Sequence, residues 1–156
     1  MLDRFDLKLL NLVQRDDGRT ADSLASDVAL SSSAIARRLR RLRRDGWIAR
    51  TIALLSPRLT ARRLRAIVLV QLSEHADHRG IDALVQRLAA TPQVQFAVAV
   101  AGPHDIVLLI DCGDMEEFTS IADRVLVADP TVRRYETSFV KRELKFAPFV
   151  DLAERP

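Results

Sequence analysis

Arginines crowd the segment 32–45, and guanidinium groups are the side chains best suited to binding the phosphates of a polyanion. Ile35, Leu39 and Leu42 recur in the same segment at spacings of four and three, which places them on one stripe of a helix. Much of the remaining helix surface is covered by Arg37, Arg38, Arg40, Arg41 and Arg44. The segment therefore predicts a helix that is anchored by one face and cationic elsewhere.

The neighbouring residues indicate a helix-turn-helix. A run of three serines can accept hydrogen bonds from the free N–H groups at the start of the arginine helix, and Gly46 supplies its C-terminal cap. Leu24, Ala25 and Val28 form the apolar stripe of an earlier short helix, and only residues 29–31 separate the two helices. A solvated helix face is the alternative interpretation. The tight turn between two short helices favours DNA binding over it.

The expected DNA contacts follow from position along the second helix, because the first turns of such a helix face the bases in the major groove. Contacts with base edges or flanking phosphates are expected from Ser32, Ser33, Arg37 and Arg38. Contacts with the DNA backbone are expected from Arg41 and Arg44.

The histidines and the cysteine do not indicate catalysis. His75 and His78 lie in the sequence HADH between an expected strand and an expected helix, where a solvated loop is a simpler interpretation than a metal site. Cys112 is the only cysteine and lies in an apolar run, which predicts a buried, inert thiol in a reducing compartment. No nucleophile motif or phosphate loop appears. We expect no catalytic residues, no metal and no cofactor.

The charge is divided unevenly along the chain. Residues 1–66 carry 15 Lys+Arg against 7 Asp+Glu, whereas residues 67–156 carry 9 against 14. A basic first half fits a polyanion, and an acidic second half predicts a different partner. No apolar run approaches the roughly 20 residues that a membrane span needs, and the charged N-terminus does not resemble a signal peptide. We expect a cytoplasmic protein without a membrane partner.

Residues 1–50 predict a small helical domain. Asp3 can cap a first helix with Leu9, Leu10 and Val13 on its inner stripe, and Thr20 can cap the second. After these helices, the β-branched and apolar segment from Trp47 to Leu55 predicts a strand, or wing. Trp47 itself is expected to plug the core beneath the arginine helix. Residues 51–65 are expected to form this strand and a connector to a second domain.

Residues 66–156 predict the ferredoxin-like order β-α-β-β-α-β, so the whole chain is expected to be α+β with a winged helix-turn-helix domain in front. The first expected strand begins at Ala66, and the other three span Val94–Ala101, Ile106–Cys112 and Thr131–Val140. Residues 102–105 form a tight hairpin turn between two of them. Two helices cover one face of such a sheet, and only the short tail Phe146–Leu152 remains for the other. The uncovered apolar face therefore predicts a partner subunit.

The chain resembles the leucine-responsive and asparagine-type (feast/famine) transcriptional regulators over nearly its whole length. The opening pattern of that family is similar to Leu2-Asp3, Asp6, Leu9-Leu10, Val13 and Gly18-Arg19. Its helix-turn-helix pattern is similar to Leu24-Ala25, Leu30-Ser31, Ser33, Ile35, Arg37-Arg38, Leu42, Gly46 and Ile48. In the second half, Gly102 with Asp105 resembles the family's hairpin, and Val132 through Thr137 to Lys145 resembles its final strand.

The resemblance implies a DNA-binding domain joined to a ligand-sensing domain, a homodimer or a higher assembly of dimers, and an amino acid or similar small molecule as effector. The effector is expected at the dimer interface, against Gly102, His104, Asp105, Tyr135 and Thr137. Gly102 lets a ligand approach the backbone, and Asp105 can pair with an α-ammonium group. The alternative interpretation is that Gly102 and Asp105 only form the hairpin, because glycine and aspartate are ordinary turn residues. The sequence departs from many family members at Ala29, His104 and Tyr135.

Two other functions remain open from the residues. Siroheme decarboxylases have a similar two-domain architecture, so an enzyme is one alternative. A small-molecule sensor whose helical domain binds no DNA is the other. Turnover would distinguish the enzyme, and salt-dependent binding to arbitrary duplex DNA would distinguish a DNA-binding protein from the sensor.

Overall fold

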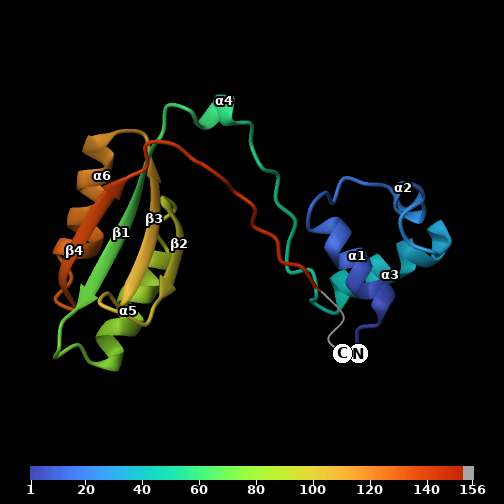
Figure 1. Ribbon diagram of the computed structural model, residues 1–156. Helices are drawn as coiled ribbons and strands as arrows, with labels where there is room; N and C mark the ends of the chain where they lie inside the picture. Colours follow the sequence, from blue (N-terminus) through green and yellow to red (C-terminus); the bar gives the residue numbers. More distant parts are fainter. Residues whose placement is uncertain (153–156) are drawn as a thin grey trace. The chain divides into compact units, whose positions relative to one another are not determined.

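The structure is a computed structural model that describes residues 1–152 and contains two compact units (Figure 1). One unit comprises Met1–Leu54 together with the tail that begins at Lys145, and the other comprises Leu55–Leu144. Within the described residues, no helix is both long and apolar enough to span a membrane.

Three capped helices form the first unit. The Asp3 side chain accepts hydrogen bonds from two N–H groups in the first turn, the Thr20 hydroxyl caps the second helix, and Ser31 caps the third. Gly46, with a φ of 77°, follows the third helix and allows the chain to turn there. These helices are α1 (Arg4–Val13), α2 (Ala21–Ala25) and α3 (Ser32–Arg44).

The apolar stripes of the three helices meet in one core, as predicted. Leu9, Leu24, Ile35 and Leu42 are fully buried together in it. Val28 also packs there, although α2 ends at Ala25 and Val28 lies in the following turn. Burying the stripe of α3 fixes which side of that helix faces outward.

The predicted strand from Trp47 to Leu55 is wrong for this chain. Residues 49–56, all of which the structure describes, adopt neither helix nor strand. Apolar side chains in the segment stay exposed, with Ile52 at 65% and Leu54 at 64%. A strand needs a neighbouring strand to satisfy its backbone groups, and none lies beside this segment in the first unit. Trp47 is also 57% exposed, so it does not plug the core.

The C-terminal tail packs on α1 through two amide side chains. Gln14 donates to the Val150 carbonyl at 2.5 Å and accepts from the Val150 N–H at 3.0 Å. Asn11 donates to the Leu152 carbonyl at 3.1 Å and accepts from the Leu152 N–H at 2.9 Å. Each amide thus pairs with both backbone groups of one tail residue, as a neighbouring strand would.

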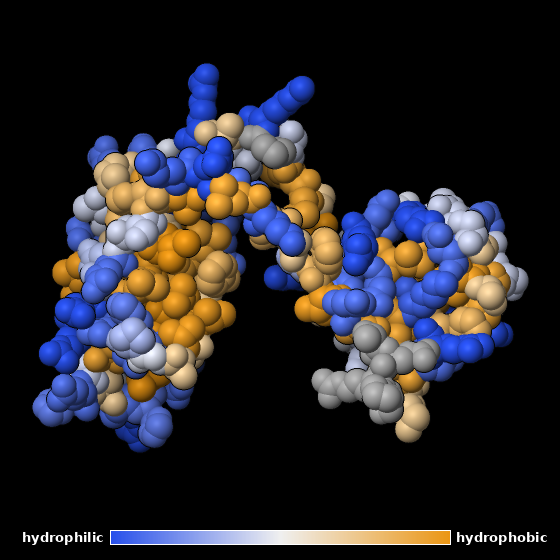
Figure 2. Space-filling model, in the orientation of Figure 1, coloured by the Kyte–Doolittle hydropathy of each residue, from blue (hydrophilic) through white to orange (hydrophobic). Residues whose placement is uncertain are grey.

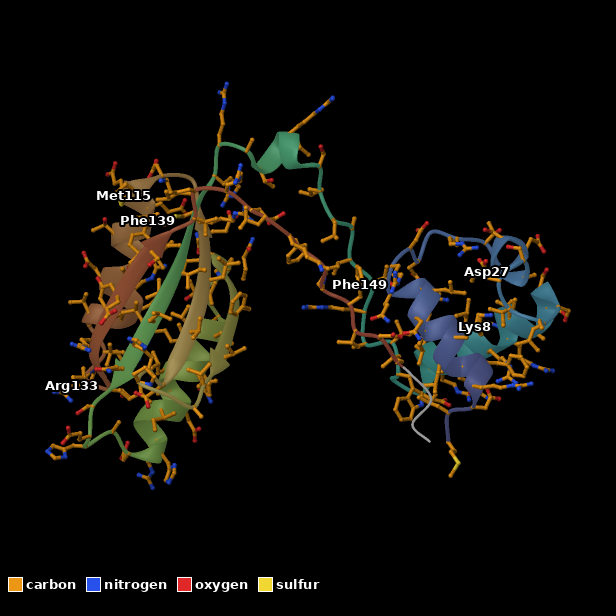
Figure 3. All side chains as sticks on the ribbon, in the orientation of Figure 1. Lys8, Asp27, Met115, Arg133, Phe139 and Phe149 are labelled. Carbon is orange, nitrogen blue, oxygen red and sulfur yellow. The ribbon has the colours of Figure 1, made fainter. Side chains whose placement is uncertain are left out.

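Because of this packing, the tail belongs to the helical unit and not to the predicted domain 66–156. It therefore does not serve as the cover of the sheet. Phe149, labelled in Figure 3, lies with its ring centre 4.8 Å from the Arg15 guanidinium of the same unit. Leu152 packs against the helical core. The tail therefore belongs structurally to the helical unit, because its hydrogen-bond partners and its apolar contact are both there.

Replacing Asn11 and Gln14 together by alanine is expected to release the tail. The N–H groups of Val150 and Leu152 would lose their acceptors, and each lost hydrogen bond is worth about 1 kcal/mol. Amide hydrogen exchange at those two residues should rise by about tenfold or more. Gln86→Ala, on the exposed surface of α5 (His78–Ala89), is the control and should leave that exchange unchanged. Unaltered exchange in the double variant would contradict this packing.

The second unit has the predicted β-α-β-β-α-β order, with the strands in the sheet order β2-β3-β1-β4 and every neighbouring pair antiparallel. This is the ferredoxin-like arrangement expected from the sequence. Its main elements are β1 (Leu64–Leu72), α5 (His78–Ala89), β2 (Val94–Ala99), β3 (Ile106–Cys112), α6 (Met115–Ala122) and β4 (Val132–Phe139). A short helix, α4 (Pro57–Thr60), precedes them, and a π-helical turn, η1 (Asp123–Val127), extends α6.

Alternation along the strands gives the sheet two different faces. Val68 and its partner Leu108 are fully buried beneath α5 and α6. Ile67 pairs with Leu109, which in turn pairs with Phe96, and these three side chains lie on the opposite face. Figure 2 shows this apolar face as a broad hydrophobic area over the strands. We call it the open face of the sheet.

Candidate nucleic-acid interface and hairpin site

The outward surface of α3 is strongly basic. Ser33, Arg37, Arg40 and Arg44 are exposed, whereas Ile35 on the same helix is fully buried. A shallow hollow on this surface is lined entirely by arginines, namely Arg37, Arg38, Arg40, Arg41 and Arg44. The structure therefore brings the expected arginines to one side of the helical unit, where a polyanion can reach them.

Two of these arginines are already engaged within the protein. Arg38 Nη1 lies 2.7 Å from a carboxylate oxygen of Asp6 and 2.7 Å from one of Asp3. Arg41 Nη2 lies 2.6 Å from the other oxygen of Asp6. The hydrogen bonds to Asp6 and then Asp3 raise the pKa of the Arg38 guanidinium above its ordinary value. In residues 1–152, by contrast, no ion pair engages Arg37 or Arg40.

The start of α3 is capped by a serine side chain. The Ser31 hydroxyl accepts from the Ala34 N–H at 3.3 Å, so Ser31 caps the helix. Ser32 and Ser33, which were predicted to contact DNA, follow in the first turn, and Ser33 is exposed. Their hydroxyls are therefore placed where helix-start groups commonly meet phosphate.

In the second unit, the hairpin turn is held to β1 by its own residues. The Asp105 carboxylate accepts a hydrogen bond from the Leu72 N–H at 2.8 Å, and the Asp105 N–H donates to the Val70 carbonyl at 2.9 Å. Gly102 has a φ of 155°, a conformation that favours glycine. Asp105 thus has a structural role in the turn, and only one of its oxygens is used by that contact.

A polar cluster lies beside the hairpin on the open face. The Gln71 side chain donates to the Pro103 carbonyl and accepts from Arg134 at 2.7 Å. Arg134 also lies 3.5 Å from Glu136, whose carboxylate is 3.8 Å from His104 Nε2. That nitrogen is buried and has no hydrogen-bond partner among the described residues. We call Gln71, His104, Arg134 and Glu136 the hairpin cluster.

Tyr135 and Thr137 do not join the hairpin cluster. Tyr135 pairs with Val70 and Thr137 with Val68, both of which are fully buried beneath the helices. Cross-strand partners share a face, so these two side chains point toward the helices while Glu136 between them points to the open face. Within one chain, Tyr135 and Thr137 therefore lie on the other face of the sheet from Glu136, and their expected place in an effector site at the dimer interface stays a prediction.

The sequence analysis did not name Gln71, Arg134 or Glu136 as site residues, although the last two had a signal in the sequence. Arg134 and Glu136 are polar residues two apart on the final strand, the spacing that puts side chains on one face. Their neighbour Gln71, however, lies 63 residues away from Arg134 along the chain, and only the sheet register brings the two together.

Both units of the chain match known protein families. Residues 2–49 match the winged helix-turn-helix DNA-binding family, and residues 65–148 match the Lrp/AsnC ligand binding domain. The second match alone covers more than half of the chain. The chain belongs to the Lrp/AsnC family. The family resemblance inferred from the sequence is thereby confirmed, as is the α+β fold class.

Individual relatives of this Lrp/AsnC protein are transcriptional regulators. An HTH-type regulator of Sinorhizobium fredii is 34% identical over 92% of this chain and 85% of its own. The DNA-binding transcriptional activator DecR of Escherichia coli is 29% identical over 94% and 95%, respectively. A transcriptional regulator of Neisseria meningitidis, solved as a complex with L-Met, is 28% identical with a TM-score of 0.83, covering 95% of both chains. The chain is thus a regulator of transcription with a DNA-binding and a ligand-binding domain.

The family assignment favours regulation over the enzyme alternative. Its matched domains and its relatives are regulatory. In the part of the chain that the structure describes, no group of His, Cys, Asp and Glu side chains is placed to hold a metal ion. Burial raises the pKa of the Cys112 thiol, in keeping with the inert role expected for it.

Proposed function

We propose that this regulator binds operator DNA as a homodimer, or as an assembly of dimers, and that an amino acid or similar small molecule changes its operator affinity. The observation that carries the DNA-binding part is the basic surface of α3, whose apolar stripe is buried in the helical core. Ser32 and Ser33 with Arg37 contact bases or flanking phosphates, and Arg44 contacts the backbone.

Replacing Arg37 by alanine is the direct test of base contact. Loss of a base-reading arginine costs about 1–3 kcal/mol and relaxes specificity at one position of the operator. We expect this loss in titrations with an operator selected from random duplexes. The control is Arg79→Ala, which removes a positive charge that is also exposed, on α5. Operator affinity that is the same in both variants would contradict the assignment of α3.

The homodimer is supported by the open face of the sheet. Phe96, Val98 and Ile67 are each 39–46% exposed there, although they are large and apolar. A contiguous apolar area of this kind is typical of a protein interface. One recognition helix also makes few contacts, and a two-fold dimer can place two such helices on half-sites about one DNA turn apart.

We propose the hairpin cluster as the effector site. A zwitterionic amino acid needs a cation for its carboxylate and an anion for its ammonium group, and Arg134 and Glu136 supply one of each. The unpaired, buried nitrogen of His104 would gain a hydrogen bond from a ligand. The similarity to the Neisseria meningitidis regulator, solved as an L-Met complex, supports an amino acid as the ligand class. Gly102 and the free oxygen of Asp105 adjoin this site.

A further inference from the structure

Asp6 of α1 holds more hydrogen bonds from α3 than a helix-capping role needs. Its carboxylate is 1% exposed and accepts from the Asp3 N–H at 3.1 Å, which completes the capping box. It also accepts from Arg38 at 2.7 Å and from Arg41 at 2.6 Å. One buried carboxylate therefore engages two arginines of the helix that faces DNA.

These two arginines are costly to withdraw from Asp6. An ionised carboxylate that is buried without its partners loses the interactions that compensate for its desolvation. Arg38 is held further by the Asp3 carboxylate at 2.7 Å and by the ring of Phe5, whose centre lies 5.7 Å from the guanidinium carbon. Arg38 and Arg41 therefore have stronger partners inside the protein than a mobile, solvated phosphate contact offers.

The arginines that lack such a partner are the ones available to DNA. Arg37 and Arg40 are exposed, and no ion pair reaches either of them within residues 1–152. Arg44 has only an exposed contact with its neighbour Asp45. The surface of α3 thus contains arginines of two kinds, although the sequence presents them as one run.

We propose that Asp6 is a specificity-determining residue that withholds Arg38 and Arg41 from DNA phosphates. Affinity for arbitrary DNA grows with the number of phosphates that a protein neutralises, whereas base contacts discriminate between sequences. By keeping two cations of α3 paired, Asp6 lowers binding to arbitrary DNA and leaves recognition to the unpaired side chains of the same helix. This inference rests on the proposed DNA binding.

The test is the salt dependence of binding to arbitrary duplex DNA, measured with the full chain. Asp6→Asn keeps the size of the side chain and removes its charge. Each arginine that newly meets a phosphate steepens the slope of log K against log salt by about 0.9. We expect the slope of the variant to steepen by about 0.9–1.8, so that affinity falls roughly 3- to 12-fold more than in wild type between 50 and 200 mM salt. The ratio of operator to arbitrary affinity should fall.

Two comparisons separate release of the arginines from a simple change of charge. Asp22→Asn removes the same charge from α2, where no ion pair is formed within the described residues, and should leave the slope unchanged. In the Asp6→Asn chain, replacing Arg38 and Arg41 by methionine should restore the wild-type slope. The thermal unfolding of each variant is measured first, and binding is then compared at a temperature at which all variants are folded. A structural role alone would change thermal stability without changing the slope.

The arginine variants also distinguish this inference from the proposed function. In the wild-type background, Arg44→Ala removes the proposed backbone contact and should lower the slope by about 0.9, whereas Arg41→Ala should not lower it. Equal lowering by both, or an unchanged slope in Asp6→Asn, would overturn the role of Asp6 while leaving DNA binding intact. Absence of salt-dependent binding by the wild type would instead overturn the DNA binding itself.

Discussion

Val98→Asp is expected to convert the protein into monomers and to weaken operator binding by about 10²- to 10⁴-fold. Val98 is 46% exposed in β2 and lies on the open face opposite Val107, so aspartate there places a charge in the proposed dimer interface. An unpaired charge in an apolar interface is strongly disfavoured. Losing the dimer removes the effective-concentration advantage of a second recognition helix, which is worth a factor of about that size.

A matched valine provides the control for this substitution. Val85 is 52% exposed on α5, away from the open face, and Val85→Asp introduces the same charge at a similar exposure. Light scattering at micromolar concentration should give a dimer or larger assembly for wild type and Val85→Asp, and a monomer for Val98→Asp. A Val98→Asp protein with the wild-type mass would show that the open face is not the interface.

Titration with a panel of amino acids is expected to reveal an effector that shifts operator affinity by about 5- to 150-fold, the range that a coupling of 1–3 kcal/mol gives. Glu136→Gln preserves the shape of the side chain but removes the charge proposed to meet the ammonium group. Loss of a hydrogen bond between charged groups costs about 1.5–3 kcal/mol, so effector binding measured by calorimetry should weaken accordingly. The operator shift at a given effector concentration should shrink with it.

Glu74→Gln is the control for the effector experiment. Glu74 is 80% exposed and pairs with Arg133 at 3.2 Å, so its substitution removes one carboxylate of the same unit outside the hairpin cluster. Asp105→Ala is a less specific variant, because it also removes the acceptor of the Leu72 N–H. Undiminished effector binding by Glu136→Gln would exclude the proposed ammonium contact. Binding of no amino acid by the wild type would leave the second unit as a dimerisation module.

Local signals in the sequence determined the three helices of the first unit and the order of the strands and main helices in the second. Asp3, Thr20 and Ser31 were readable as N-terminal caps because a cap bonds to groups only two or three residues away. The burial of Ile35, Leu39 and Leu42 was predictable from helical periodicity, which is also a local property. The order β-α-β-β-α-β then left few topologies for the second unit, and the predicted ferredoxin-like arrangement is confirmed.

The failed predictions are those that depended on partners far away in sequence. An apolar, β-branched run such as residues 47–55 has strand propensity, but strand formation needs a second strand, which the first unit does not place beside it. The tail likewise has no local feature that would send it to α1. Its position is decided by Asn11 and Gln14, which lie 141 and 136 residues away from their tail partners.

The two candidate sites show the same division at the level of single side chains. The sequence by itself determined that α3 is basic, whereas packing of α1 against α3 decided which arginines meet Asp6 and which remain free. The sequence also indicated the last strand of the sheet, but the register of β1 with β4 decided that Glu136 faces the open side and Tyr135 the helices. Composition and periodicity are properties of a single segment. Which charges form ion pairs, and which face of the sheet covers the core, depend on two segments that pack together, so only the tertiary structure could supply these.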